Sequence, residues 1–260
     1  MTTMQRNPVV VHAAGASLLQ KPFSWHPAAT AATPVAEQVP KRSYDIVPVR
    51  PENFNDVMDF LRHNFFLDEP LNVHLKLVPS SEPGACPELE QFSMSSLEQG
   101  FSLMAVAPDG RVMGVCLNAV SHPGDVEELE KLALECPNQK FKIILGILAH
   151  VEKQSDVHNR FNVKTVFEVP ILSVDSSCRG QGIATALLNG SLQLARRLGY
   201  PLFRIDCSSE FTARAVAKLG LHVVFSMRYD EYKPFPDQEA PLQPAAPHHE
   251  VKAMVMALNA

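Results

Sequence analysis

A short glycine-containing turn in the second half of the chain has the composition of an anion-binding site. It consists of Arg179, Gly180, Gln181, Gly182, Ile183 and Ala184. A strand is expected to end near Val174 and a helix to begin at this turn, so unpaired backbone N–H groups and the positive end of the helix dipole would face a ligand. The glycines permit close backbone approach, and Arg179 can add charge-assisted hydrogen bonds. The pattern predicts a pyrophosphate cradle, although an ordinary strand-to-helix turn with two glycines would look the same.

Two other nucleotide-binding motifs do not fit this turn. A dinucleotide fingerprint requires Gly-x-Gly-x-x-Gly, and no third glycine follows Gly180 and Gly182 at the required place. A P-loop requires Gly-Lys followed by Ser or Thr, and no such tripeptide follows. A dinucleotide-dependent oxidoreductase is therefore disfavoured.

Two adjacent carboxylates, Asp68 and Glu69, stand next to Phe65 and Phe66 near the end of an expected helix. Burial beside aromatic rings raises the pKa of a carboxyl group, and such a group can act as a general base. A base of this kind would suit a reaction in which an amine loses a proton before it attacks a thioester. A solvated turn, in which Pro70 ends the helix, is the alternative interpretation.

A third group of polar residues, Ser208, Ser209 and Thr212, follows an expected strand. Capping of the next helix would by itself explain these hydroxyl groups. Cys207 precedes them, and a buried strand cysteine is favoured over a nucleophile because no His or Asp partner is evident nearby.

The elements expected around these residues alternate between strands and helices. Strands are expected over 44–49, 101–107, 112–120, 165–174, 202–207, 222–232 and 251–258, the last of which could close the sheet. Helices are expected over 51–66, 125–158 (divided by Pro137), 182–198 and 210–219. Pro170 lies inside a strand, so the ladder must have a bulge or an edge there. This order predicts an α/β fold with a mixed sheet and at least one parallel pair.

Composition excludes several classes of protein. The 260 residues are 46% hydrophobic and 20% charged, with a net charge of −5 and no extended basic run, which argues against nucleic-acid binding. No apolar run reaches the roughly 18 residues of a membrane span. Five scattered cysteines and ten histidines without ligand spacing predict no disulfide framework, no metal and a reducing, cytoplasmic location. Residues 1–43 predict a disordered N-terminal arm, and 44–260 a folded domain.

The turn resembles the acetyl-CoA pyrophosphate motif of the GNAT superfamily, Gln/Arg-x-x-Gly-x-Gly/Ala, through Arg179, Gly182 and Ala184. The resemblance implies acetyl-CoA as co-substrate and the GNAT fold. That fold has a mixed central β-sheet with a splayed pair of parallel strands flanked by helices. It also implies that the backbone of Leu172, Ser173 and Val174 pairs with the pantetheine arm, and that N–H groups near Val174 stabilise the oxyanion.

The run Phe65-Phe66-Leu67-Asp68-Glu69-Pro70-Leu71-Asn72 resembles the hallmark of insect-type arylalkylamine N-acetyltransferases. The resemblance implies acetylation of dopamine, serotonin, tryptamine or tyramine. It makes Glu69 the general base, acting through water, with Asp68 as its supporting acid. Ser208 would protonate the leaving thiolate, helped by Thr212, which stands where the family has a serine. The aromatic substrate pocket would include Phe65, Phe66 and Phe211, the last standing where the family has a tyrosine.

Other functions remain open beside this one. They are acetylation of a polyamine or a protein terminus, transfer of longer acyl groups, and a non-catalytic acyl-CoA-binding module. The presence of Asp68 and Glu69 argues against the binding module, which needs no base. The expected partner is a small amine, with no nucleic acid and no membrane, and the chain is expected to be a monomer. His248 and His249 lie in a polar segment and are given no role.

Overall fold

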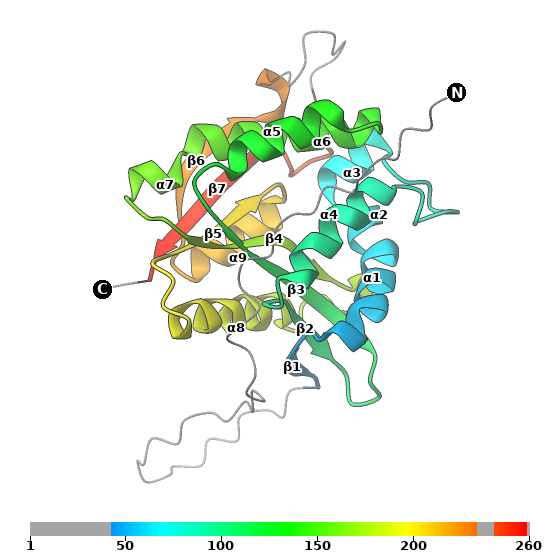
Figure 1. Cartoon of the computed structure of the whole chain (residues 1–260). Helices are drawn as coiled ribbons and strands as arrows, with labels where there is room; N and C mark the ends of the chain where they lie inside the picture. The colour runs from blue at the N-terminus through cyan, green and yellow to red at the C-terminus, as the bar shows by residue number, and fades with distance from the viewer. Residues whose placement is uncertain (1–42, 233–241, 259–260) are drawn as a thin grey trace, which may run out of the picture. The chain divides into compact units, whose positions relative to one another are not determined.

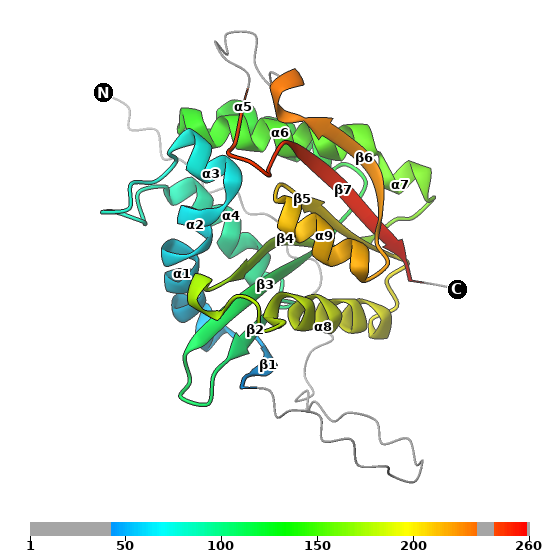
Figure 2. The same cartoon turned by 180° about the vertical axis from the view of Figure 1, so that it is seen from behind.

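The core of the fold is a seven-stranded mixed sheet (Figures 1 and 2) in the part of the chain that the computed structural model describes, residues 43–232 and 242–258. The strand order is β1-β2-β3-β4-β5-β7-β6, and every neighbouring pair is antiparallel except β4 and β5. The strands are β1 (Asp45–Pro48), β2 (Leu103–Val106), β3 (Val112–Ser121), β4 (Val166–Val174), β5 (Leu202–Cys207), β6 (His222–Arg228) and β7 (Glu250–Ala257). The expected mixed α/β sheet with one parallel pair is confirmed.

The parallel pair β4–β5 is joined for only part of its length. Its register pairs run from Phe167 with Phe203 to Val169 with Ile205, and beyond that point β4 continues to Val174 without pairing with β5. On its other edge, β4 stays paired with β3 as far as Val174. The two strands therefore separate beyond Val169, as the expected splayed pair requires.

A bulge marks the point of separation. Leu117 pairs with Ile171 and Ala119 with Glu168, so two residues of β4, Val169 and Pro170, face one residue of β3. A proline has no N–H to give to a ladder, and a bulge is one of the few places where a strand tolerates it. The interruption predicted at Pro170 is confirmed.

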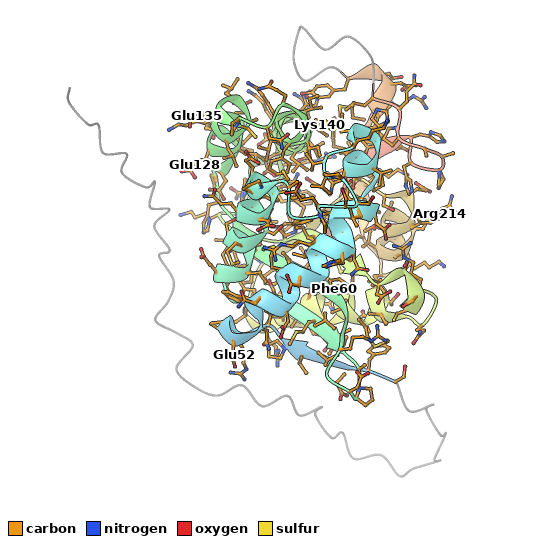
Figure 3. All side chains as sticks on the ribbon, turned by 90° about the vertical axis from the view of Figure 1, so that its right-hand side faces the viewer. Glu52, Phe60, Glu128, Glu135, Lys140 and Arg214 are labelled. Carbon is orange, nitrogen blue, oxygen red and sulfur yellow. The ribbon has the colours of Figure 1, made fainter. Side chains whose placement is uncertain are left out.

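Helices cover both faces of the sheet. They are α1 (Phe54–His63), α2 (Phe65–Asp68), α3 (Pro70–Leu75), α4 (Pro87–Glu98), α5 (Asp125–Glu135), α6 (Gln139–Ser155), α7 (Val157–Arg160), α8 (Ile183–Arg197) and α9 (Glu210–Lys218), with 3-10 turns η1 (Pro51–Asn53), η2 (Ser176–Cys178) and η3 (Tyr229–Glu231). One apolar core lies between the sheet and α1 to α6, and a second lies between the opposite face and α8 and α9, which face the viewer in Figure 2. Phe60 of α1 belongs to the first core, whereas Glu128 and Glu135 of α5 are exposed (Figure 3).

A buried group of charges joins α6 to the parallel pair. Arg204 of β5 is 1% exposed and donates two hydrogen bonds to Asp206, at 2.8 and 2.9 Å, and one to Glu152 of α6. Its register neighbour across the parallel pair is Glu168 of β4. Burial and, after it, the charge of Glu152 raise the pKa of Glu168 to about 8, against the opposing effect of Arg204. The joined end of the pair thus carries a carboxyl group that stays largely protonated at neutral pH.

Three expectations about the elements are corrected. The helix expected over 51–66 breaks at Asn64, whose φ of −121° and ψ of −81° lie outside the helical region and whose side-chain amide donates to the Phe60 carbonyl at 2.9 Å. The strand expected over 251–258 does not close the sheet at an edge, since β7 lies between β5 and β6. No element was expected between residues 70 and 100, where α3 and α4 form.

The helices expected over 125–158 are present as α5 and α6, divided at Pro137 and followed by the short α7. The disordered arm expected over 1–43 falls, apart from Ser43, outside the described residues. Among the described residues, no helix is long and apolar enough to span a membrane. In the same ranges, no group of three or more His, Cys, Asp or Glu side chains could hold a metal ion.

Candidate active site

The predicted phosphate turn joins β4 to α8. After β4 ends at Val174, the Asp175 carboxylate accepts hydrogen bonds from the backbone N–H and hydroxyl of Ser177, at 2.8 and 2.7 Å, and so closes η2. Gly180 and Gly182 then have φ of +81° and +77°, the left-handed region in which glycine has no Cβ penalty. Gly182 is the N-cap residue of α8, and the next backbone N–H groups open the helix.

A cavity of about 240 Å³ lies on this turn. It is lined by Val174, Cys178, Arg179, Gly180, Gly182, Ile183, Ala184 and Thr185. A Cβ built on Gly180 would meet no atom within 4 Å, so the backbone there is open to a ligand. These residues fit the pyrophosphate of acetyl-CoA, because they combine free helix N–H groups, a concave surface and the guanidinium of Arg179. Gln181 belongs to the turn, and its backbone carbonyl accepts a hydrogen bond from the Tyr44 hydroxyl at 3.4 Å.

The strand before the turn offers the second part of an acyl-CoA site. Leu172, Ser173 and Val174 pair with β3 on one edge, whereas their other edge faces the gap left by β5. Backbone groups on that open edge can pair with the amide groups of an extended pantetheine chain, as a neighbouring strand would. Their contact with the co-substrate stays a prediction.

An ion pair connects the phosphate turn to the acidic segment. The Arg179 guanidinium donates to the Asp68 carboxylate at 2.6 Å, and the two side chains are 58% and 46% exposed. The pair joins residues that are 111 positions apart in the chain. The structure therefore brings Asp68 to the edge of the phosphate cavity, a placement that the sequence did not indicate.

Glu69 is the N-cap residue of α3, with Pro70 at the first helical position. Its Oε2 accepts a hydrogen bond from the Asn72 backbone N–H at 2.7 Å, whereas its Oε1 is buried and has no hydrogen-bond partner among the described residues. Burial raises the pKa of Glu69, against smaller opposing effects of the Ser208 hydroxyl and the backbone N–H groups of Asn72 and Leu71. One oxygen is thus held by the helix and the other is free to take a proton.

Ser208 follows β5 and lies close enough to Glu69 for its hydroxyl to lower the pKa of that carboxyl group. The structure therefore brings these two predicted residues together. Ser209 is the N-cap residue of α9, but its side chain makes no capping hydrogen bond there. Thr212 lies half-buried in the first turn of α9, and no hydrogen bond joins its side chain to Glu69 or Ser208 within the described chain. Capping alone therefore does not account for the serine pair.

The three predicted aromatic residues differ in their surroundings. Phe66 is 1% exposed and belongs to the core beneath α2, with Phe65 edge-on to it at a ring-centroid distance of 6.3 Å. Phe211 is 62% exposed and lies edge-on to His248, with ring centroids 5.2 Å apart. Phe65 is half-buried and Phe211 is exposed, whereas Phe66 is part of the core and has almost no surface to offer a ligand; contact of any of them with an amine stays a prediction.

Sequence reasoning missed two residues at this site. His248 was given no role, yet its Nδ1 accepts a hydrogen bond from the Glu210 backbone N–H at 3.2 Å and so caps α9. Tyr229 of η3 is 1% exposed, and its hydroxyl donates to the Ser208 backbone carbonyl at 3.0 Å. No local pattern could have indicated either contact, because each bridges 21 or more positions.

An open parallel pair, a bulge at the point of separation and a glycine turn at the start of the next helix are the features expected of a GNAT fold. The Acetyltransferase (GNAT) family matches residues 142–221, which include β4, the turn and α9. Several solved structures agree with this match over the larger part of the chain. Arylalkylamine N-acetyltransferase 2 from Aedes aegypti is 31% identical, with 83% of this chain and 99% of that one covered and a TM-score of 0.77.

Two further structures are similar at lower identity. A mosquito arylalkylamine N-acetyltransferase like 5b is 25% identical, covering 83% of this chain and 100% of that one, with a TM-score of 0.75. The Drosophila melanogaster polyamine N-acetyltransferase, which forms N-acetylagmatine, is 27% identical, with the same coverage and a TM-score of 0.73. The chain belongs to the GNAT acetyltransferase family, whose members take the acetyl group from acetyl-CoA.

Proposed function

We propose that this acetyltransferase acetylates the primary amine of an arylalkylamine of the dopamine, serotonin, tryptamine and tyramine class. The observation that carries the proposal is the buried carboxyl group of Glu69, which has one free oxygen beside the Ser208 hydroxyl. The 31% identical relative, an arylalkylamine N-acetyltransferase, supports the substrate class. The half-buried Phe65, four residues before Glu69 in the chain, and the exposed Phe211, three residues after Ser208, would supply aromatic surface for a substrate ring.

In the proposed reaction, the amine nitrogen forms a bond to the acetyl carbonyl carbon and the bond from that carbon to sulfur breaks. Oε1 of Glu69 accepts the proton that the amine loses, through a water molecule. Backbone N–H groups near Val174 stabilise the negative oxygen of the tetrahedral stage. The Ser208 hydroxyl, helped by Thr212, gives its proton to the departing thiolate. Because Ser208 lies beside Glu69, the carboxyl group can return a proton to the serine and complete the cycle.

Substitution of Glu69 by glutamine tests the assignment of the base. Glutamine keeps the size of the side chain but cannot accept a proton, so we expect kcat to fall by about 10²-fold or more. The Kd for acetyl-CoA, measured by isothermal titration calorimetry, is expected to stay within about twofold because the phosphate turn is unchanged. The Glu98→Gln variant is the matched control, since Glu98 is exposed on α4. Equal loss of activity and acetyl-CoA affinity in Glu69→Gln would point to a folding defect and remove the support for a base.

A second candidate function is acetylation of a polyamine or agmatine, which the 27% identical Drosophila relative favours. The two candidates are separated by thiol-release assays with dopamine, serotonin, tryptamine, tyramine, spermidine and agmatine. Saturable turnover restricted to spermidine and agmatine would overturn the arylalkylamine assignment. Competition between acetyl-CoA and longer acyl-CoA donors measures the acyl-chain preference in the same assay.

We also propose that the enzyme acts as a monomer in the cytoplasm. All five cysteines are free thiols and all are buried, which supports a reducing compartment. Analytical ultracentrifugation with and without acetyl-CoA measures the oligomeric state. A stable dimer in both conditions would contradict the monomer.

A further inference from the structure

Tyr229 connects the far edge of the sheet to the turn that carries Ser208. It follows β6, in η3, and its side chain is 1% exposed within the core formed by α1 to α6. Its hydroxyl donates a hydrogen bond to the Ser208 backbone carbonyl at 3.0 Å, and its backbone N–H donates to the His249 carbonyl at 3.1 Å. Hydrogen bonds therefore hold both the backbone and the hydroxyl of Tyr229, and the phenol extends from η3 to the turn that carries Ser208.

The phenol of Tyr229 also lies near Glu69. Burial raises the pKa of Tyr229 well above its usual value, and the charges of Glu69, Cys207 and Glu250 raise it further. The phenol therefore stays protonated and remains a hydrogen-bond donor over the pH range in which a carboxylate base works. Ser208 thus stands between two neighbours, with its carbonyl held by Tyr229 and its hydroxyl beside Glu69.

We propose that Tyr229 is a positioning residue that acts through Ser208, holding the turn after β5 so that the serine hydroxyl faces the Glu69 carboxyl group. This inference rests on the proposed function, in which Glu69 and Ser208 handle the protons. Tyr229 itself touches no reacting atom. Its hydrogen bond is made to the backbone of Ser208, which leaves the serine hydroxyl free for Glu69 and the leaving group.

Within the described ranges, Tyr229 is the residue whose side chain hydrogen-bonds to the backbone of the serine pair, and the further bond there is the helical one from the Ala213 N–H to the Ser209 carbonyl. Ser209, the next residue, makes no side-chain capping hydrogen bond that could hold the chain at the start of α9. The cap of α9 comes instead from His248, which binds the N–H of Glu210 beyond the serine pair. Loss of the Tyr229 hydroxyl would leave the partly buried Ser208 carbonyl without this donor, and we expect the turn to shift until the carbonyl meets another donor. A displacement of about 1 Å at a catalytic group can lower a rate by about 10²-fold.

The test is the Tyr229→Phe variant, which keeps the ring in the core and removes only the hydroxyl group. Tyr232→Phe is the matched control, because the Tyr232 hydroxyl also donates to a backbone carbonyl, that of Gly146 on α6, at 3.4 Å. Both variants lose a hydrogen bond from a phenol to a backbone carbonyl, at 3.0 Å for the buried Tyr229 and at 3.4 Å for the half-buried Tyr232, so their melting temperatures are compared along with their kcat. We expect kcat to fall by about 10-fold or more in Tyr229→Phe and to stay within about twofold in Tyr232→Phe.

The pH profile of kcat supplies a measurement that a loss of stability would not change. Glu69 must be ionised to act as a base, so activity falls on the acid side as it becomes protonated. The Ser208 hydroxyl lowers the pKa of Glu69, and its displacement removes that effect. The acid limb of Tyr229→Phe is therefore expected to move to higher pH, in the same direction as that of Ser208→Ala. The limb of Tyr232→Phe is expected to stay in place.

A double-mutant cycle between Tyr229→Phe and Ser208→Ala distinguishes the possible failures. If the tyrosine acts through the serine, the double variant loses little more kcat than Ser208→Ala alone. Multiplicative losses, or a Tyr229→Phe variant with the pH profile of the wild type, would overturn the inference while leaving the function of Glu69 intact. If neither Glu69→Gln nor Ser208→Ala lowers kcat, the proposed function itself fails. Thermal unfolding of each variant confirms that folded protein is compared.

Discussion

The buried carboxyl group of Glu168 makes the stability of this fold depend on pH. Burial raises its pKa from 4.5 to about 8, so the folded protein holds a proton that the unfolded chain has released. The resulting stabilisation is complete below about pH 4.5 and is lost as the pH rises through about 8. The shift of about 3.5 pH units, at about 1.4 kcal/mol each, sets an upper limit of about 5 kcal/mol. Although the carboxyl group is buried, the residue as a whole keeps some contact with solvent, and water screens part of this cost, so we expect about 2 kcal/mol.

Substitution of Glu168 by glutamine should remove this dependence, since glutamine is neutral at every pH. The assay is urea unfolding at pH 5, 7 and 9, followed by circular dichroism. We expect the two proteins to have similar free energies of unfolding at pH 5, and the glutamine variant to be more stable by about 2 kcal/mol at pH 9. Glu98→Gln, on the exposed face of α4, is expected to differ from the wild type by the same small amount at each pH. A constant difference for Glu168→Gln across the three pH values would refute the reasoning.

Two further predictions concern the phosphate turn. Asp68→Asn removes the exposed ion pair with Arg179, and an exposed ion pair contributes about 0–1 kcal/mol. Because the free guanidinium can then bind a phosphate group, the Kd for acetyl-CoA in calorimetry should fall by up to about fivefold. Weaker binding would show that Asp68 orients the arginine instead. Gly180→Ala places a Cβ at φ +81° without a clash, so about 1 kcal/mol of strain should lower the melting temperature and weaken acetyl-CoA binding. Gly110→Ala is the control, since Gly110 has a similar φ of +87° in the β2–β3 hairpin. It should lose stability but keep its affinity for acetyl-CoA. Equal losses of acetyl-CoA affinity in the two variants would contradict a role for the phosphate turn.

The parts of the fold that local chemistry determines were predictable from the sequence. The phosphate turn follows from two glycines between a strand and a helix, and both adopt the left-handed conformation that the pattern requires. The bulge in β4 follows from Pro170, which cannot donate to a ladder. In both cases the physical cause lies within a few residues of its effect.

Other features depend on contacts that no local pattern contains. The helix expected over 51–66 has suitable periodicity, but the backbone leaves the helical region at Asn64, with φ of −121° and ψ of −81°. The pairing of Arg179 with Asp68 and of Tyr229 with Ser208 requires the strand order, which places distant segments next to each other. The role predicted for Glu69 comes from resemblance, whereas its unpaired Oε1 becomes evident only when α3 and its neighbours are assembled.

The position of β7 has a consequence for how this enzyme is made. Its residues come after those of β6 in the chain, yet it lies between β5 and β6 and supplies the register pairs for both. During synthesis, β6 therefore has no strand to join until residues 250–257 have left the ribosome, and η3 with Tyr229 has no fixed place beneath Ser208. The part that contains the predicted phosphate turn is formed by earlier residues and can fold first. We expect a nascent chain halted before residue 250 to be recognised by chaperones through the open edge of β5.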